Sequence, residues 1–530
     1  MKRRDLLALA GAPALAATTA LDATLARPAV AQPARVLRFV PQGNLNNPDP
    51  VWTTTTIARN HGLMIWDTLF AVTDKLEPRP QMVEGHEVLD DGKRWRFTLR
   101  DGLAFHDGEP VRGTDCVASV QRWAKRRGLG QRLLEQTDEM RAVSDRVFEI
   151  RMRKPYPLLP TALADWCFVM PERVARTSPF EQISDYTGSG PFRFVRDEWI
   201  SGSKAVYARN EKYVPRQEPP DGAAGAKVVN FDRVEWQIVP DQATAAAALQ
   251  SNEVDWVEQP LFDLLPTLRR ARGVRILRND DVGAIAMVAF NHLHPPFNNP
   301  KLLRALLPAV DQQAFMEAAY GEERDLFRTG VGVFTPGLPM ATTAGLEALT
   351  GPRDLALARK LVAESGYAGE KVILMSPSDY ADQQAYSQVV RDLLQKLGIA
   401  VEYVSMDWGT LVQRRASREP PEKGGWSIFC TTYEGMTVAN PASHLPLRGN
   451  GLDGWFGWPT NKPMEALRDQ WFDAPDLAAQ RRICDEMQRL AFQDVPFLPV
   501  GQRFLPTAVR DSLRDIVKAS YPVFWGVRKV

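Results

Sequence analysis

Several short stretches of the sequence hold residue types that hydrolases and metal sites use. Ser189 lies in "TGSGP", where the spacing is G-S-G and not the wider G-x-S-x-G of a hydrolase nucleophile elbow. His292 and His294 in "NHLHPP" are two residues apart, so both could ligate one metal ion only in an extended segment. We expect no catalytic residue and no metal site. Ser189 is interpreted either as part of a loop whose backbone amides approach a bound molecule or as part of a structural turn.

The N-terminal residues have the pattern of an export signal. Arg3 and Arg4 stand in a basic head, and the Leu- and Ala-rich run after them is interrupted by Gly11, which suits it poorly to span a membrane. Twin arginines followed by "DLL" resemble a Tat signal, and Ala29 with Ala31 forms an A-x-A cleavage site. We expect residues 1–31 to be a Tat-type signal peptide and the mature protein to be periplasmic. No cysteine lies near the cleavage site, so no lipid anchor is expected.

The composition favours a large globular protein without a nucleic-acid partner. A chain of 530 residues is longer than one core usually supports, so two or more lobes are expected. The net charge is +1 and the basic residues are spread along the chain, unlike the basic patch of a nucleic-acid-binding protein. No C-x-x-C pair occurs among Cys116, Cys167, Cys430 and Cys484. We expect buried thiols, while an oxidising compartment leaves a disulfide open.

Two strand–helix–strand units can be recognised along the chain. In the first, "FDRVEWQIV" and "EVDWVE" have the alternation of strands, and "QATAAAALQ" between them is a helix capped by Asp241. In the second, the strands "KVILM" and "IAVEYV" flank a helix that ends at Gly398, where a positive φ costs little. The two units are far apart in sequence. They predict two separate α/β sheets.

Five blocks of the chain resemble blocks of one protein family, in the same order. They are the region from "IWDTLF" to "GTDCVASVQRW", followed by "TGSGPFRF", "DRVEWQIVPDQATAAAALQSNEVDW", "AFNHLHPPFNNPKLLRALLPAVD" and "ARKLVAESGY". On these blocks the chain is identified as a member of the peptide and nickel class of extracytoplasmic solute-binding proteins of ABC transporters, family 5. The resemblance covers nearly all of the chain after the signal peptide.

The resemblance implies an α/β fold of the type II periplasmic-binding-protein kind, in its large form known as cluster C. Two lobes are then joined by a two-strand hinge, and lobe 1 carries an extra scaffold subdomain. We expect lobe 1 over residues 34–283 and 496–530, with the scaffold subdomain over about 74–185, and lobe 2 over 284–495.

The glycine-rich stretch "LRDGLAFHDGEPVRGTDC" belongs to the scaffold subdomain in this family. Its glycines serve turns, and Thr114 is expected to cap the helix that follows. His106 and Asp107 lie in this stretch. A structural role there explains both residues, so they are not expected to act as a catalytic pair.

The implied function is solute capture for import. A peptide or another small polar organic solute is held between the lobes and delivered unaltered to the permease subunits of an ABC importer by a monomer that needs no cofactor. Binding of nickel or a metal chelate, of an opine or of a sugar by the same fold stays open. Outside the family, a secreted hydrolase and a chaperone-like binder of unfolded chains are the alternatives, and the latter requires a large exposed apolar surface.

Candidate solute-binding residues are mostly aromatic, because rigid rings bury ligand surface at low entropy cost. Trp408 and Tyr433 stand in blocks that match cleft regions of relatives. The full set of candidates is Trp52, Trp66, Ser189, Asn291, Trp408, Tyr433, Glu434 and Trp455.

The chain departs from the family at the place where a peptide ammonium is bound. Dipeptide- and oligopeptide-binding relatives have an aspartate there, in a segment like W-x-x-D-Y-x-D-P. Here the segment reads "WSIFCTTYEGMTVANPASHL", in which Glu434 is the only carboxylate. A charge-assisted hydrogen bond contributes about 1.5 to 3 kcal/mol. If Glu434 points away, a free peptide N-terminus would be rejected, so ordinary peptides, modified peptides, opines and sugars all stay open.

Overall fold

The computed structural model describes residues 35–53, 55–378 and 380–530. Their strands form two large sheets, one four-stranded sheet and two two-stranded ribbons. No helix in these residues is long and apolar enough to cross a membrane. The predicted signal peptide, residues 1–31, lies outside the described residues, so it stays a prediction.

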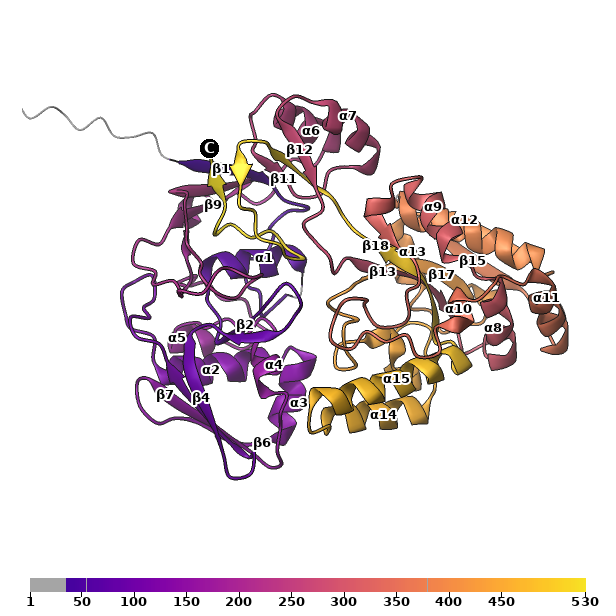
Figure 1. Ribbon diagram of the computed structural model, residues 1–530, viewed down its shortest axis with the longest axis horizontal. Coiled ribbons are helices and arrows are strands. Elements are labelled where there is room, and N and C mark those ends of the chain that lie inside the picture. The colour runs from indigo at the N-terminus through magenta and orange to yellow at the C-terminus, as the bar shows by residue number, and fades with distance from the viewer. Residues whose placement is uncertain (1–34, 54, 379) are drawn as a thin grey trace, which may run out of the picture. The chain divides into compact units, whose positions relative to one another are not determined.

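The first large sheet has seven strands, and they come from both ends of the chain (Figure 1). Across the sheet their order is β12 (Val274–Leu277), β19 (Thr507–Arg510), β11 (Trp256–Val257), β1 (Val36–Val40), β10 (Arg233–Gln237), β9 (Lys204–Arg209) and β8 (Phe192–Phe194). β1 lies between β10 and β11 and runs parallel to both. The helix α6 (Gln242–Gln250) connects β10 to β11, and the Asp241 carboxylate accepts a hydrogen bond from the N–H of Thr244 at its start. The first predicted strand–helix–strand unit is therefore confirmed.

The second large sheet has six strands. Their order is β14 (Phe327–Arg328), β18 (Phe497–Arg503), β13 (Ala284–Phe290), β17 (Ile428–Glu434), β15 (Val372–Pro377) and β16 (Val401–Met406). All residues of β13 are buried, which places this strand in the core of the second lobe. The second predicted unit is also confirmed: α12 (Ala381–Lys396) connects the parallel strands β15 and β16, and Gly398 after it has a φ of 83°.

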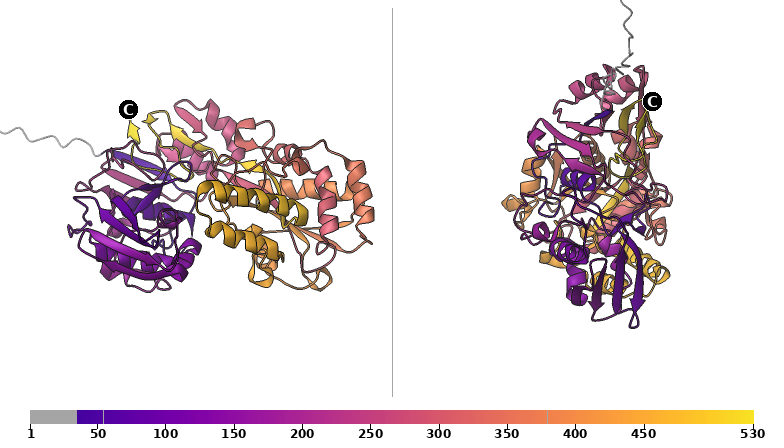
Figure 2. Two further views of the ribbon diagram at one scale, coloured as in Figure 1. Left: turned by 60° about the horizontal axis from the view of Figure 1, so that its bottom comes forward. Right: turned by 90° about the vertical axis from the view of Figure 1, so that its left-hand side faces the viewer.

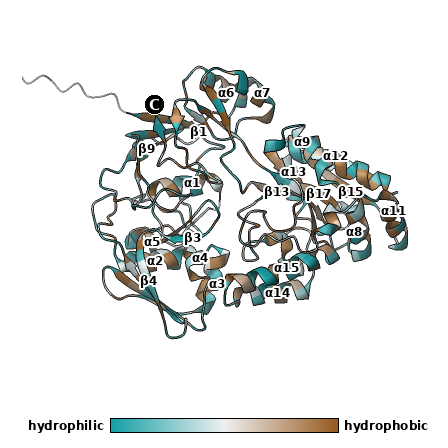
Figure 3. Ribbon diagram, viewed as in Figure 1, coloured by the Kyte–Doolittle hydropathy of each residue, from teal (hydrophilic) through white to brown (hydrophobic). Residues whose placement is uncertain are grey.

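Helices pack against both large sheets. The longer ones in the first lobe are α1 (Thr56–Ile65), α2 (Gly113–Ala124), α3 (Gly128–Gln136) and α7 (Leu265–Arg270), with the short α4 (Leu159–Leu163) and α5 (Glu172–Ala175). The second lobe has α8 (Pro300–Leu306), α9 (Gln312–Tyr320), α10 (Glu347–Thr350), α11 (Leu355–Glu364), α13 (Trp408–Arg414), α14 (Lys462–Phe472) and α15 (Leu477–Asp494). α14 and α15 lie side by side (Figure 2). Hydrophilic and hydrophobic residues alternate along both, as expected of helices with one buried face (Figure 3).

The chain crosses between the two lobes twice. Residues 278–283 connect β12 to β13, and residues 504–506 connect β18 to β19. The predicted end of lobe 2 at residue 495 differs from this, because β18 pairs with β13 and β14 and so belongs to the second sheet. Gly283 has a φ of 54°, and a Cβ at this position would lie 2.2 Å from the carbonyl oxygen of Arg503. Glycine therefore allows the two crossings to approach each other closely.

The scaffold region of the first lobe is an antiparallel sheet packed against α2. Its strands are β4 (Val83–Leu89), β5 (Arg94–Leu99), β7 (Val147–Met152) and β6 (Thr137–Ala142). The prediction that Thr114 caps the helix is wrong, since α2 begins at Gly113. The Asp115 carboxylate instead accepts a hydrogen bond of 2.7 Å from the N–H of Arg112. Gly113 occupies the first position because a Cβ there would lie 2.8 Å from the carbonyl oxygen of Ser144.

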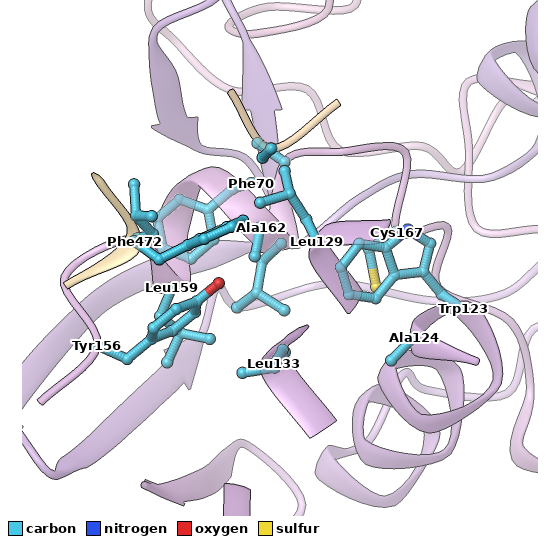
Figure 4. Close-up of a cluster of buried hydrophobic side chains, with 14 of the residues drawn as sticks. Phe70, Trp123, Ala124, Leu129, Leu133, Tyr156, Leu159, Ala162, Cys167 and Phe472 are labelled. Carbon is cyan, nitrogen blue, oxygen red and sulfur yellow. The ribbon is translucent and has the colours of Figure 1, made fainter. Parts of the chain in front are cut away.

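The core beneath the scaffold helices extends to buried side chains of the second lobe. Figure 4 shows the buried side chains of this core, among them Trp123, Leu129, Leu133, Tyr156, Leu159 and Phe472. Phe472 is the last residue of α14, and the Arg132 guanidinium lies 5.1 Å from the centre of its ring. Lys154 and Asp473 form an ion pair beside it. The lobes are thus joined here by side chains as well as by the two crossings.

Candidate functional site

Two cavities lie between the lobes and meet at Glu434. The first, the hinge cavity, has a volume of about 370 Å³ and is lined by residues near the crossings, including Gln42, Glu258, Tyr380, Arg503 and Tyr521. The second, the scaffold cavity, has a volume of about 460 Å³ and is lined by α1, the scaffold helices and the segment after β17. Thr56, Glu434 and Met436 line both cavities. The two cavities therefore form one cleft with Glu434 at their junction.

The hinge cavity lies where parallel strands of the first sheet end. Val40 of β1 is paired with Val257 of β11, so the residues after each strand come together. The N–H of Gln42 donates to Oε2 of Glu258 at 2.7 Å, and Nδ2 of Asn60 donates to Oε1 at 3.4 Å. The carboxyl ends of parallel strands are the usual place for ligand sites in α/β proteins.

Glu258 has an unusual acidity for a carboxyl group. Burial raises its pKa to about 7, although the N–H of Gln42 and the charge of Arg59 act in the opposite direction. The neighbouring charge of Glu434 adds to the increase. Near neutral pH, Glu258 is therefore divided between its protonated and its charged form.

Glu434 is the last residue of β17 and contacts the first lobe. The hydroxyl of Thr56 donates to its Oε1 at 3.1 Å, and Nη1 of Arg59 lies 3.6 Å from its Oε2. Both partners belong to the first turns of α1. Gly435 follows without a side chain, since a Cβ there would lie 2.4 Å from the carbonyl oxygen of Val282 in the first crossing. The side chain of Glu434 is 53% exposed, so its carboxylate is accessible to a solute in the cleft.

Arg59 is the cation opposite Glu434, and two aromatic rings hold it in place. Its guanidinium carbon lies 5.4 Å from the ring centre of Trp166 and 5.4 Å from that of Tyr521. These two rings meet edge to face, with their centres 5.2 Å apart. Nε and Nη2 of Arg59 donate to Oδ1 of Asn60 at 3.3 and 3.2 Å. Arg59 lines the scaffold cavity, so the cleft contains a fixed positive charge beside the carboxylate of Glu434.

The second lobe contributes Arg503 to the hinge cavity, and this charge is already paired. Nη1 of Arg503 lies 3.1 Å from Oδ2 of Asp382, and its Nη2 donates to the hydroxyl of Thr432 at 3.2 Å. Burial disfavours the charged form of Arg503, but Tyr320 and Asp382 raise its pKa above the ordinary value. Arg503 therefore stays charged in its place beside the second crossing.

Aromatic side chains gather beside the cleft in the second lobe, and we call them the aromatic cluster. Its members are Tyr380, Trp408, Phe429, Tyr433, Trp455 and Phe456, with ring centres between 5.3 and 5.9 Å apart in four contacting pairs. The guanidinium of Arg415 lies 5.6 Å from the ring centre of Trp408 and 4.4 Å from that of Phe456. Burial lowers the pKa of Arg415. The cluster reaches the hinge cavity through Tyr380 and adjoins Glu434 through Tyr433.

Residues 77–434 match the model of a family described as bacterial extracellular solute-binding proteins, family 5 Middle, which is more than half of the chain. The chain belongs to this family. A probable peptide ABC transporter periplasmic-binding protein of Sinorhizobium fredii is 39% identical to it over 532 residues, covering 100% of this chain and 99% of the relative.

Solved structures share the fold at lower identity. The agropinic acid complex of the binding protein AgaA from A. tumefaciens R10 has a TM-score of 0.72 at 21% identity, covering 93% of this chain and 99% of that one. A dipeptide-binding protein from Pseudoalteromonas sp. SM9913, in complex with Met-Leu, has a TM-score of 0.73 at 19% identity, covering 94% and 100%. The two-lobe α/β fold of the family is therefore shown for this chain.

In this family 5 protein, five of the predicted solute-binding residues lie in or beside the cleft. Glu434 lines both cavities. Trp408, Tyr433 and Trp455 belong to the aromatic cluster described above. Trp52 donates from Nε1 to the carbonyl oxygen of Phe180 at 3.2 Å, and its neighbours on both sides in the sequence line the scaffold cavity. Contact of these five residues with a solute stays a prediction.

The other three predicted residues are buried parts of the protein core. Trp66 is fully buried and donates from Nε1 to the carbonyl oxygen of Thr187. The hydroxyl of Ser189 donates to the carbonyl oxygen of Val169 and accepts from the N–H of Asp67. The side chain of Asn291 donates to the carbonyl oxygen of Trp426. The structure gives each of the three a structural role and places none of them among the residues that line the two cavities.

Sequence reasoning missed Arg59, Glu258, Arg503 and Tyr521, which line the cleft. The sequence held one signal for Arg59. The helix α1 has eight buried residues, and Arg59 is a charged residue near the start of its apolar face. Glu258 follows β11, Arg503 is the last residue of β18, and Tyr521 stands in the C-terminal tail. At these places no spacing distinguishes a cleft residue from a surface residue.

The remaining reactive residues are explained by local contacts. Nε2 of His292 is 3.1 Å from the carbonyl oxygen of Pro496, and Nε2 of His294 is 2.8 Å from that of Arg418. His106 contacts backbone atoms of Gly188 and Gly190. Within residues 35–53, 55–378 and 380–530, no group of three or more His, Cys, Asp or Glu side chains could hold a metal ion. All four cysteines are buried and free.

Proposed function

We propose that this protein is the periplasmic solute-binding component of an ABC importer, and that it carries a peptide or another small polar organic solute. It works as a monomer, delivers the solute unaltered to membrane permease subunits and catalyses no reaction. The proposal rests on the cleft between the two lobes. Charged and aromatic side chains from both lobes line a pair of connected cavities there, with Glu434 and Arg59 at the junction.

The mechanism follows from where these side chains come from. A solute in the cleft contacts α1 and the strand ends of the first lobe together with β17 and the aromatic cluster of the second. Such a solute favours the arrangement in which both sets of contacts are made, and it shifts the population of the protein by the difference in affinity. The two crossings supply the place at which the lobes turn, because both are short and neither residues 278–283 nor residues 504–506 belong to a strand.

Several observations support a peptide or peptide-like solute. Opposite charges stand next to each other in the cleft, which suits a zwitterion better than a neutral sugar. The relative from Sinorhizobium fredii is named for peptide transport, and one solved structure of the same fold holds Met-Leu. Another holds agropinic acid, an opine, so this class is tested alongside peptides.

A thermal-shift screen of the mature protein tests the proposal. The compounds are pooled di- and tripeptides, glutathione, agropinic acid, common sugars and a nickel–histidine complex. We expect a saturable increase in melting temperature with at least one peptide or opine, because a solute at 100 times its Kd stabilises the folded state by about 2.7 kcal/mol. Mass spectrometry of the same samples should find the compound unchanged. Conversion of the compound, or no stabilisation by any of them, contradicts the proposal.

A further inference from the structure

The guanidinium of Arg59 has the properties of an anchor for a negatively charged group. It is 13% exposed, it lines the scaffold cavity, and its carbon lies 5.4 Å from the ring centres of both Trp166 and Tyr521. Two of its nitrogens are bound to the side-chain oxygen of Asn60, which carries no charge. Among the described residues, its one carboxylate partner within 4.0 Å is Glu434, and that contact at 3.6 Å is too long for a hydrogen bond.

The other arginines that line the two cavities are already occupied. Arg127 donates to both carboxylate oxygens of Asp165, at 2.7 and 3.3 Å. Arg126 donates to the backbone carbonyl oxygens of Val51 and Trp52. Arg503 is paired with Asp382, as described above. Arg59 differs from these arginines because its Nη1 lies 3.6 Å from Oε2 of Glu434, beside the junction of the two cavities, in a contact too long for a hydrogen bond.

Glu434 is a weak partner for this cation. Its side chain is half-exposed and comes from the opposite lobe, so the pair contributes little to stability. A carboxylate placed in the plane of the guanidinium would instead make short, charge-assisted hydrogen bonds, which are about twice as strong as neutral ones. Because the rings already hold the guanidinium, little rotamer entropy is lost when such a group binds.

We propose that Arg59 binds a carboxylate of the solute, which displaces Glu434 from its contact with Nη1. Released from Arg59, the carboxylate of Glu434 accepts hydrogen bonds from a cationic group of the same solute. The inference rests on the proposed function and narrows its solute class to molecules with a free carboxylate. That carboxylate is either the C-terminus of a peptide or the carboxylate of an amino-acid head group, as in a γ-glutamyl compound or an opine.

Matched pairs of compounds test the inference on the unaltered protein. In the first arm of the experiment, calorimetry compares a tripeptide pool with free C-termini with the same pool amidated at the C-terminus. Glutathione and agropinic acid form the second arm. We expect compounds of one arm to bind. If the tripeptide pool with free C-termini binds, the amidated pool should bind about 10- to 100-fold more weakly. If glutathione binds and the tripeptide pool does not, unchanged binding of glutathione amidated at its C-terminus assigns the carboxylate to the γ-glutamyl head group. Binding of agropinic acid alone assigns it to the head group of an opine.

Variants then assign the effect to Arg59. Arg59→Gln should weaken binding of the compound by about 10- to 100-fold. Arg59→Lys should keep part of the affinity, since lysine keeps the charge but lacks the fork geometry of the guanidinium. Arg79→Gln, an arginine with a 62% exposed side chain on β3 (Pro78–Pro80), is the control and should change nothing. Glu434→Gln should strengthen binding of an N-acetylated acid, because the competing carboxylate is removed.

The outcomes separate the two proposals. Equal affinity for the acid and the amide, or full affinity in Arg59→Gln, overturns the assignment of Arg59 and leaves solute binding intact. Stabilisation by none of the compounds overturns the proposed function and the inference with it. The acid and amide comparison needs no variant, so it tests the need for a solute carboxylate even if Arg59→Gln fails to fold, and Arg59→Lys then tests the assignment to Arg59.

Discussion

Replacing Glu258 by glutamine should stabilise the protein at alkaline pH and have little effect in mild acid. The pKa of this carboxyl is about 7 in the folded protein, against an ordinary value of 4.5. Between these two values the folded protein holds a proton that the unfolded chain has released. Its free energy of unfolding therefore falls as the pH rises through this window and becomes level above pH 7. Glutamine has no charge to bury, so the variant lacks this loss.

The size of the effect follows from the two pKa values. The difference between 4.5 and about 7, at about 1.36 kcal/mol for each pKa unit, corresponds to about 3 kcal/mol above pH 7. At pH 5 the same linkage gives less than about 1 kcal/mol, because the unfolded carboxyl is then only partly ionised. The advantage of Glu258→Gln over the unaltered protein should therefore grow by about 2 to 2.5 kcal/mol between pH 5 and pH 8.

Urea unfolding followed by tryptophan fluorescence at pH 5, 6, 7 and 8 measures this directly. Glu211→Gln serves as the control, because Glu211 is 68% exposed and should show no such dependence. Glutamine can still accept the N–H of Gln42, so any change in that hydrogen bond adds a constant at every pH. If the difference between variant and parent stays the same from pH 5 to pH 8, Glu258 does not hold the proton and the reasoning is refuted.

Three further substitutions test other parts of the structure. Lys227→Met removes the ammonium that lies 2.8 Å from the fully buried carboxylate of Asp67. The free energy of unfolding, measured in urea, should fall by about 3 to 5 kcal/mol, and unchanged stability would contradict the buried ion pair. Gly283→Ala should cost at least about 1 kcal/mol by the same assay, since its φ is 54° and a Cβ would meet the Arg503 carbonyl oxygen; a neutral result would mean that the crossings are not in close contact. Tyr433→Ala should weaken solute binding about 10-fold in calorimetry, because an aromatic contact is lost. Full affinity in this variant would show that Tyr433 is not part of the site.

Much of the fold could be predicted because local chemistry determines it. The Asp241, Asn299 and Asp311 side chains cap helices in the structure, and each stands directly before a helix in the sequence. The end of the second lobe could not be predicted in the same way. β18 joins the second sheet through pairing with β13, a strand about 200 residues earlier, and nothing in its own sequence indicates that partner.

The candidate site was predicted less well, for a physical reason. A tryptophan in a cleft and a tryptophan in a core have the same local sequence pattern, so Trp66 and Trp455 could not be separated before their surroundings were known. Glu434 was found because it is the one carboxylate in the segment compared with the family's ammonium-binding segment. Arg59 and Glu258 come together only through the parallel pairing of strands and the packing of α1, which depend on contacts distant in sequence.

The position of β19 has a consequence for how the protein is made. This strand lies between β11 and β12, and it leaves the ribosome after both because it follows them in the chain. Until it is synthesised, both neighbours have unpaired backbone groups on the facing edge, and Phe524 and Trp525 are missing from the hydrophobic interior of the same lobe. The part of the chain translated first is therefore completed last. A nascent chain truncated before residue 507 should need protection from edge-to-edge aggregation that the full-length protein does not.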